Sequence, residues 1–375
     1  MKWKIPLYKI FTDRDDNKAV NKVLQRGMDW AIGHEIAEFE KKIANYIGTK
    51  YCVAFNSGTS AGHAALLAIN INSGEVIVPS FTFISTANWP LMVNAKPKFV
   101  DIEEENFGLS PERVKVEITK NTKAIIPIHY GGRPCKIIEI DRIARNKKIT
   151  LIEDCAEALG AKIKGVSVGT FGQMSIFSFA PNKILTTGEG GAICTDSRKI
   201  FEKLQLIRSH GRKVNENYFK TSQLPNYISI GYNWRMSSMT AALGLSQFDK
   251  LDRIIQLRRR HARFYVLKLK KINEIKLPDE PKDHLHVYQL FTIQLKNNLI
   301  RNELQKFLAS RGIMTKVFFE PIHLSKFYRK SGFGKKSLPN TEKISQTVLS
   351  LPIFPGLKSE EIRHICDSIK EFFQN

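Results

Sequence analysis

One lysine in this sequence stands where an amine could do chemistry. Lys183 follows the apolar run 175–179, comes two residues after Pro181, and precedes the glycine-rich turn 188–191. An amine at the end of a buried strand is partly desolvated, which lowers its pKa and makes it a nucleophile able to form a Schiff base. The alternative is a lysine that only faces solvent, as most lysines do.

Two acidic residues end another apolar run. The strand-like segment 150–152 leads into Glu153 and Asp154. In an α/β sheet the carboxyl ends of the strands face the ligand crevice, so Asp154 is expected to point toward a site there. A carboxylate in that position can pair with a protonated ring nitrogen, such as that of pyridoxal phosphate. An acid that caps the next helix fits the same pattern.

A turn of small residues provides a third element of a site. Residues 56–61 are small and polar, follow the strand-like run 51–55, and open a helical run over 62–69. Exposed backbone N–H groups and the positive end of the helix dipole can hold a phosphate at such a turn. An ordinary capped turn between a strand and a helix is the alternative interpretation.

The elements that must position these residues alternate along the first half of the chain. Short apolar runs are separated by helical patterns, as in a sheet covered by helices on both faces. The strand-like runs are 76–78, 124–128, 150–152 and 175–179. Apolar residues recur at helical spacing from Ile36 to Ile47, which predicts a helix over 34–47 that lays one face on the core.

The pattern changes near residue 250, and we expect a large α/β domain over 1–250 and a small α+β domain over 251–375. A length of 375 residues exceeds one ordinary core, which agrees with two domains. The small domain is expected to begin with a charged helix over 251–269. Beyond it we predict a strand over 287–295, a helix over 299–310, a strand near 316–319 and a terminal helix over 359–373.

Composition indicates a soluble intracellular protein. The chain contains no run of eighteen apolar residues, and its N-terminus lacks the apolar core of a signal peptide, so we expect a cytoplasmic protein without a membrane partner. Five scattered cysteines without a CxxC pair suit a reducing compartment and predict no metal site. The net charge of +22 could attract an anionic partner, but it is spread thinly and accompanies no nucleic-acid module, so we expect no nucleic-acid partner.

The three segments around Gly58, Asp154 and Lys183, in this order, resemble the sugar aminotransferases of the DegT/DnrJ/EryC1/StrS family. The resemblance extends from Phe39 to the segment 351–357. It implies the pyridoxal-phosphate-dependent aspartate aminotransferase type I fold, in which a large domain with a mostly parallel seven-stranded sheet is followed by a small α+β domain.

The resemblance also implies a role for each matching residue. Lys183 is expected to hold pyridoxal 5'-phosphate covalently and, once released, to move the proton during transamination. Asp154 is expected to pair with the pyridine nitrogen. The other implied cofactor contacts are Gly58, Thr59 and Ser178 at the phosphate, Phe83 stacked on the ring, and Glu157 near the ring oxygen.

Further motifs imply a shared site. Asn233 lies in a segment, 231–237, that resembles the family motif whose asparagine reaches the cofactor phosphate of a neighbouring subunit, so a homodimer with shared active sites is expected. His210, Arg212 and His323 lie in segments that resemble the loops lining the sugar-nucleotide entrance, and they are candidate substrate contacts. Loop histidines and arginines that are only solvated are the alternative.

The substrate class follows from the same resemblance. An amino group is expected to pass from L-glutamate to a nucleotide-linked keto-deoxysugar. The segment 182–191 is most similar to the branch that aminates carbon 4, which includes GDP-perosamine synthases, so a GDP- or UDP-linked 4-keto-6-deoxyhexose is predicted. The alternatives are a dTDP-linked 3- or 4-keto sugar, or a non-catalytic member that binds nucleic acid or regulates transcription. The last would predict loss of Lys183 or Asp154.

Overall fold

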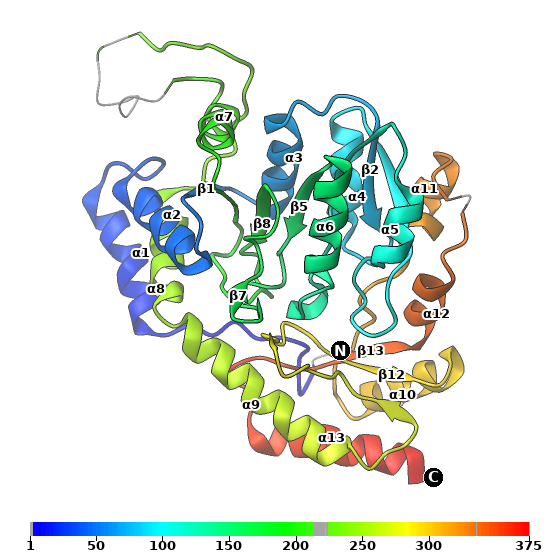
Figure 1. Ribbon diagram of the computed structural model, residues 1–375. Coiled ribbons are helices and arrows are strands. Elements are labelled where there is room, and N and C mark those ends of the chain that lie inside the picture. Colours follow the sequence, from blue (N-terminus) through cyan, green and yellow to red (C-terminus); the bar gives the residue numbers. More distant parts are fainter. Residues whose placement is uncertain (1–2, 214–221, 223, 335, 375) are drawn as a thin grey trace.

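A seven-stranded sheet lies at the centre of the part of the chain that the computed structural model describes, residues 3–213, 222, 224–334 and 336–374 (Figure 1). The strand order is β1-β9-β8-β5-β4-β2-β3. Only β9 among these described strands runs against its neighbours β1 and β8, so the predicted mostly parallel sheet is confirmed. The strands are β1 (Tyr51–Phe55), β2 (Glu75–Pro79), β3 (Lys96–Val100), β4 (Thr122–Ile125), β5 (Thr150–Asp154), β8 (Met174–Ser178) and β9 (Gly191–Thr195).

Helices cover both faces of this sheet. Successive residues of a strand point to opposite faces, and Val76 and Val78 join the apolar cluster under α3, α4 and α7, whereas Ile77 joins the cluster under α5 and α6. The predicted helix over 34–47 is confirmed as α2, and Phe39 and Ile43 of its apolar face are fully buried. The helices are α1 (Arg14–Arg26), α2 (His34–Ile47), α3 (Gly58–Ala68), α4 (Ile84–Met92), α5 (Pro111–Glu117), α6 (Ile137–Lys147), α7 (Arg198–Arg208) and α8 (Ser238–Phe248).

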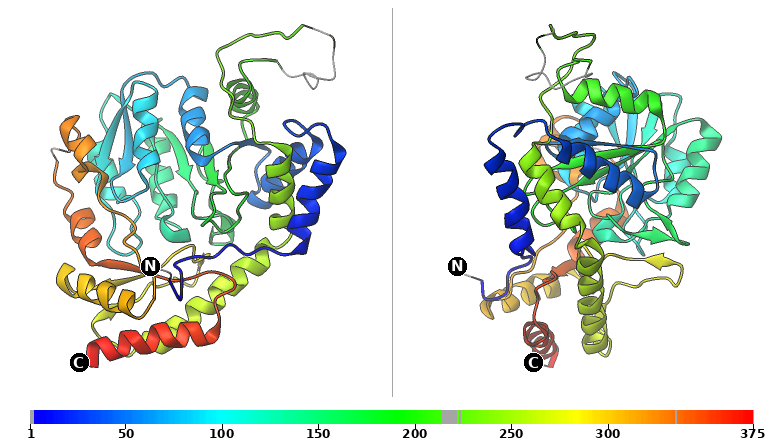
Figure 2. Two further views of the ribbon diagram at one scale, coloured as in Figure 1. Left: turned by 180° about the vertical axis from the view of Figure 1, so that it is seen from behind. Right: turned by 90° about the vertical axis from the view of Figure 1, so that its left-hand side faces the viewer.

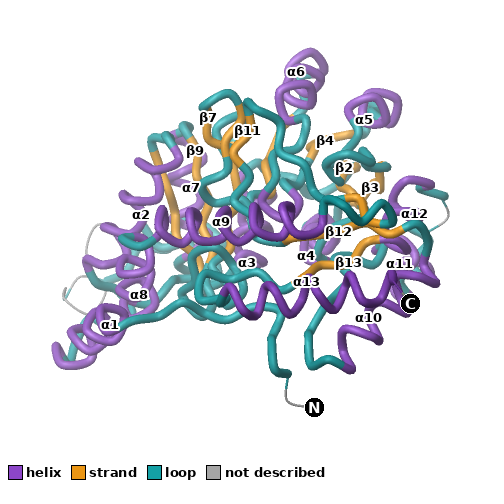
Figure 3. The backbone as a smooth tube through the Cα atoms, turned by 90° about the horizontal axis from the view of Figure 1, so that it is seen from below, coloured by secondary structure: helices purple, strands orange, loops and turns teal. Residues whose placement is uncertain are grey.

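A second core is formed mainly by the chain from α9 (Leu251–Leu269) to the C-terminus. A three-stranded sheet of order β10-β12-β13 packs with α9, α10 and α13, and α13 lies along α9 (Figure 3). Ile5, near the N-terminus, bridges to Ile313 and packs into this cluster. The elements of this part are α9 (Leu251–Leu269), β10 (Ile275–Lys276), β12 (Phe291–Leu295), α10 (Asn298–Ser310), α11 (Lys326–Lys330), α12 (Pro339–Thr347), β13 (Val348–Leu351) and α13 (Ser359–Gln374).

Two strands predicted in this part differ from the structure. The strand predicted over 287–295 begins only at Phe291, because Arg258 enters from α9 and donates hydrogen bonds to the carbonyls of Tyr288 and Gln289. The strand predicted near 316–319 is wrong, since one bridge from Lys316 to Ser350 replaces it. Phe318 and Phe319 instead pack beside Tyr130, so aromatic packing determines the path of this segment.

The remaining short elements link the two parts. Two 3-10 helices, Tyr130–Gly132 and Ile322–Leu324, lie in loops. A small sheet has the order β11-β6-β7 and consists of β11 (His284–Leu285), β6 (Lys162–Ile163) and β7 (Val166–Ser167). Since β6 and β7 lie between β5 and β8 in the chain, this small sheet joins that connection to the C-terminal part.

The described residues of the connection between α7 and α8 extend away from the body of the molecule (Figures 1 and 2). Leu224 and Ile230, two of its described residues, are 93% and 85% exposed. Among the residues that the structure describes, none of the helices combines the length and the hydrophobicity that a membrane span requires.

Candidate active site

The carboxyl ends of β1, β2, β5 and β8 meet at one edge of the large sheet. β5 and β8 are parallel neighbours, and β1 runs in the same direction because both β1 and β8 pair antiparallel with β9. Asp154 is the last residue of β5, and Ser178 is the last residue of β8. This edge is where ligands bind in sheets of this kind, so the predicted positions of the acid and the lysine loop share one crevice.

Asp154 is a buried carboxylate with a hydrogen bond on each oxygen. Its Oδ2 accepts from the Thr86 hydroxyl at 2.8 Å, and its Oδ1 accepts from the backbone N–H of Ala156 at 3.1 Å. Burial raises the pKa of Asp154, while the Thr86 and Ala156 hydrogen bonds and the charge of Lys183 act in the opposite direction. A cationic partner would therefore favour the ionised carboxylate.

Lys183 and Glu157 form an ion pair beside this carboxylate. The Lys183 Nζ lies 3.3 Å from Glu157 Oε1, and their side chains are 13% and 11% exposed. The other oxygen, Oε2, accepts from the backbone N–H of Gly131 at 2.9 Å, which fixes the carboxylate in place. The charges of both Lys183 and Glu157 act on the pKa of Asp154, so the three groups interact electrostatically.

Gly58 and Ser178 bring the predicted phosphate positions together. A Cβ at Gly58 would lie 3.0 Å from Ser178 Cβ and 3.2 Å from its Oγ, so a side chain there would fill the space between the two segments. Gly58 and Thr59 begin α3, which Ser57 caps by accepting from the N–H of Ser60. The N–H groups of a first helical turn have no acceptor within their helix, so this end is suited to an anion.

Phe83 lies at the rim of the same edge. Its side chain is 59% exposed, and its ring centroid lies 6.5 Å from that of Phe319. The preceding Ser80 is fixed by His323, whose Nδ1 lies 2.6 Å from the Ser80 hydroxyl. An exposed aromatic ring on an anchored loop can stack on a flat ligand.

The three candidate substrate contacts lie in different surroundings. His323 is 1% exposed, its Nε2 lies 3.3 Å from Glu342, and its Nδ1 lies 2.6 Å from the Ser80 hydroxyl. His210 is exposed, whereas Arg212 is buried at the base of the extended connection. Their roles as substrate contacts stay predictions.

Asn233 is an exposed residue between two packed aromatic rings. The neighbouring rings of Tyr232 and Trp234 stack with centroids 3.9 Å apart, and both lie against His63. Asn233 is exposed, with its backbone oxygen beside the Asn56 side chain at the end of β1. An exposed amide next to the phosphate turn, held by two packed neighbours, is well placed to contact another molecule.

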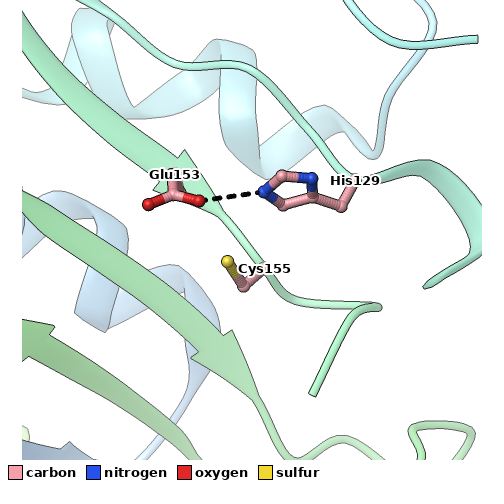
Figure 4. A group of neighbouring side chains, drawn as sticks. All are labelled: His129, Glu153 and Cys155. Atoms are coloured by element: carbon pink, nitrogen blue, oxygen red, sulfur yellow. Dashed lines mark hydrogen bonds and ion pairs between the residues drawn. The ribbon is translucent and has the colours of Figure 1, made fainter. Parts of the chain in front are cut away.

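A buried cluster behind Asp154 was not predicted from the sequence. His129, Glu153 and Cys155 place ligand-type atoms within 4.8 Å of one another (Figure 4). His129 Nε2 lies 3.2 Å from Glu153, and its Nδ1 accepts from the N–H of Cys135. The remaining donors to Glu153 are the backbone N–H groups of Gly169, Phe171 and Gly172. Because the ring nitrogens and carboxylate oxygens are occupied, the cluster ties the end of β5 to neighbouring turns.

Thr86 is a second residue that sequence analysis missed. A threonine in the first turn of a helix is common, and nothing in its own sequence neighbourhood relates it to Asp154, 68 residues later. The signal would have been the pairing of loop ends: the segment after β2 and the end of β5 both lie at the carboxyl edge of one parallel sheet.

Comparisons with known proteins identify the family. The family model of the DegT/DnrJ/EryC1/StrS aminotransferase family matches residues 11–370. GDP-perosamine synthase of Escherichia coli O157:H7 is 35% identical over 99% of both chains, and a pleiotropic regulatory protein of Geobacillus stearothermophilus is 36% identical over 94% of this chain and 93% of its own. The solved structure of S. venezuelae DesV superposes with a TM-score of 0.91 at 30% identity, covering 100% of both chains.

The arrangement of the sheet and the similarity to DesV define an enzyme that has the aspartate aminotransferase type I fold and uses pyridoxal phosphate. The chain belongs to the DegT/DnrJ/EryC1/StrS aminotransferase family. It is a pyridoxal-phosphate-dependent sugar aminotransferase, so the predicted family, fold class and cofactor are confirmed.

The residues present fit this cofactor. The cradle at Gly58 stays open because a Cβ there would meet Ser178. The donor set is also complementary: the first turn of α3 suits a phosphate, Asp154 suits a protonated ring nitrogen, and Lys183 is an amine able to hold an aldehyde.

Proposed function

We propose that this enzyme transfers an amino group from L-glutamate to the keto carbon of a nucleotide-linked deoxysugar, with Lys183 and Asp154 as its catalytic residues. The observation that carries the proposal is the convergence of the Lys183 amine, the Glu157 carboxylate and the Asp154 carboxylate at one edge of the sheet. An amine and an acid placed this way suit the two ends of one pyridine ring.

Asp154 supplies the charge that the reaction needs. Pyridoxal phosphate, when bound, supplies an electron sink for the carbon that loses its proton. Asp154 keeps the ring nitrogen protonated, because a buried carboxylate favours a cationic partner. Its Thr86 and Ala156 hydrogen bonds hold it in one orientation.

Lys183 would accept the proton that leaves the carbon bearing the amino group and would later return it. This role requires the amine to be neutral when it takes the proton. Glu157 lies 3.3 Å from the Lys183 Nζ and can accept a hydrogen bond from it, which orients the amine toward the crevice. Low exposure of both side chains keeps water away from this transfer.

The remaining binding residues orient the cofactor. We assign Gly58, Thr59 and Ser178 to the phosphate, since they lie at the first turn of α3 and the end of β8. Phe83 is assigned to the ring face, because an exposed aromatic ring beside the site can stack on a planar ligand.

The proposed substrate is a GDP- or UDP-linked 4-keto-6-deoxyhexose. Similarity to GDP-perosamine synthase along 99% of the chain supports amination at carbon 4. A dTDP-linked 3- or 4-keto sugar is the second candidate, and His210, Arg212 and His323 are the candidate contacts that would distinguish them. Turnover of a panel of keto-sugar nucleotides with L-glutamate, read as 2-oxoglutarate and as the position of the new amine, tests both.

A non-catalytic regulatory role is the alternative of a different class. Similarity to a pleiotropic regulatory protein raises it. Lys183 and Asp154 are both present, and the charge of Lys183 acts on the Asp154 carboxyl, which favours a catalytic role over a regulatory one. The same substrate panel discriminates, because a purely regulatory chain would give no 2-oxoglutarate with any keto sugar.

We further propose a homodimer with shared active sites, working in the cytoplasm. Asn233 is exposed beside the phosphate turn, and the described parts of the connection between α7 and α8 carry exposed apolar residues, among them Leu224 and Ile230. Exposed apolar side chains on an extended segment are typical of a subunit contact. Asn233 would then reach the cofactor phosphate of the partner subunit, and the monomer would be inactive.

A further inference from the structure

Thr86 connects the loop after β2 to the carboxylate of Asp154. It lies in the first turn of α4, its side chain is 1% exposed, and its hydroxyl donates to Asp154 Oδ2 at 2.8 Å. On its other side, the Thr82 hydroxyl lies 3.1 Å from the Thr86 hydroxyl, and Thr82 is also buried. The three side chains therefore form one buried chain of hydrogen bonds.

The direction of these hydrogen bonds follows from the number of protons. A hydroxyl has one hydrogen, and Thr86 donates it to the carboxylate. Thr82 must therefore donate to Thr86. A donor that itself receives a hydrogen bond is polarised and donates more strongly, so Thr82 reinforces the contact with Asp154.

The same contacts determine how many hydrogen-bond acceptor positions of Asp154 remain free. Oδ2 receives Thr86 and Oδ1 receives the N–H of Ala156, and each carboxylate oxygen can accept two hydrogen bonds. Each oxygen thus accepts one hydrogen bond and keeps one acceptor position. The carboxylate cannot rotate without breaking one of the two contacts.

We propose that Thr86, supported by Thr82, is a positioning residue that fixes the Asp154 carboxylate so that its free acceptor position meets the ring nitrogen of pyridoxal phosphate. The proposal rests on the proposed role of Asp154. Thr86 contacts neither the substrate nor the cofactor in this scheme and acts through the carboxylate.

The electrostatic surroundings of Asp154 agree with this role. Burial raises the pKa of the Asp154 carboxyl, and the Thr86 hydrogen bond is the foremost effect that lowers it again. Of the charged groups facing it, Lys183 lowers and Glu157 raises this pKa. Loss of the Thr86 hydroxyl would therefore disfavour the ionised carboxylate that a protonated ring nitrogen needs.

The loop that carries Thr82 is itself anchored. Ser80 contacts His323 through two hydrogen bonds, of 2.6 Å to Nδ1 and 3.0 Å from the backbone N–H. His323 in turn lies 3.3 Å from Glu342 on α12. Thr82 is thus held from outside the active site before any ligand binds, which is what a preorganised contact requires.

The competing explanation is that Thr86 only stabilises the start of α4. Its backbone N–H donates to the carbonyl of Phe83, a contact that any residue at position 86 would keep. A purely structural hydroxyl would affect every ligand of the site alike. A hydroxyl that positions Asp154 should affect only ligands that carry a ring N–H.

The test compares two cofactors in four forms of the full-length protein: wild type, Thr86→Val, Thr86→Ser and Asp154→Asn. The cofactors are pyridoxal phosphate and its 1-deaza analogue, in which C–H replaces the ring nitrogen, and equilibrium binding is measured for each. Loss of a hydrogen bond to a charged group corresponds to a factor of about ten or more. We expect Thr86→Val to weaken the binding of pyridoxal phosphate about tenfold and the binding of the analogue less than about twofold. Thr86→Ser should bind pyridoxal phosphate within about threefold of wild type.

Equal weakening of both cofactors by Thr86→Val, or no weakening of either, would overturn the proposal. Thr86→Ala serves as the second variant if Thr86→Val does not fold, with the same expected selectivity. A wild-type protein that binds the two cofactors equally, as Asp154→Asn should, would instead refute the role of Asp154, so the two failures are distinguishable.

Discussion

The end of β5 and the connection between α7 and α8 are opposite halves of one proposed site. Asp154 is buried, and its two carboxylate oxygens accept hydrogen bonds from Thr86 and Ala156. Asn233 is exposed, and its flanking rings, Tyr232 and Trp234, stack on each other. We propose on this basis that one chain completes the ring-binding half, whereas Asn233 adds a phosphate contact in the site of a partner subunit.

Replacement of Lys183 should have the largest effect. Lys183→Ala removes both the amine that holds the cofactor and the proton carrier, so we expect turnover to fall by a factor of about 10⁴ or more. The measurement is 2-oxoglutarate release with a keto-sugar nucleotide. The matched control is Lys147→Ala on α6, an exposed lysine that should leave turnover within about twofold. Substantial turnover by Lys183→Ala would contradict its assigned role.

Asp154→Asn should have the next largest effect. The amide keeps the shape of the side chain but loses the charge that stabilises a protonated ring, so we expect kcat to fall about a hundredfold. Steady-state kinetics with saturating cofactor separate this loss from weaker binding. An unchanged kcat would mean that another group protonates the ring.

Changing Asn233 tests the other half of the comparison. Asn233→Ala should weaken cofactor binding about tenfold, since one phosphate contact is lost. Mixed dimers of Lys183→Ala and Asn233→Ala subunits test the sharing, because a shared site would place both defects in one of the two sites and leave the other site wild type. At limiting pyridoxal phosphate, the co-refolded subunits should therefore be more active than either parent. Failure of the mixture to exceed its parents would place Asn233 in its own subunit's site.

The smallest expected effect concerns stability and pH. Burial raises the pKa of Asp154 in the folded cofactor-free protein above that of the unfolded chain. Its ionisation therefore destabilises the fold as pH rises through the folded pKa, and the penalty is fully present above that pKa. Cofactor-free Asp154→Asn should melt slightly above wild type at pH 7.5, and the gap should close as the pH falls toward about 4. A gap that widens on acidification would contradict the direction of this pKa shift.

Sequence patterns predicted the parts of the site that follow from strand ends. The positions of Asp154 and Lys183 could be inferred because an apolar run fixes a strand and the sheet fixes where strands end. Thr86 could not be inferred, since its contact joins segments 68 residues apart and threonine is common in helices. The strand expected near 316–319 was wrong because side-chain packing of Phe318 and Phe319 determines the local path.

The surroundings of Asn233 could not be predicted from the sequence for a different reason. Asn233 lies between Tyr232 and Trp234, and the packing of these rings against His63 joins segments far apart in the chain, which no local pattern encodes. Its proposed ligand lies in another subunit. A single chain therefore specifies where this amide is displayed but not what it binds.

Covalent trapping of the cofactor tests the central claim most directly. Borohydride reduction of the protein loaded with pyridoxal phosphate fixes the cofactor to the lysine that holds it, and peptide mass spectrometry then locates that lysine. The account predicts one modified residue, Lys183, with no trapping in Lys183→Ala. Stable modification of a different lysine at equimolar cofactor would contradict it.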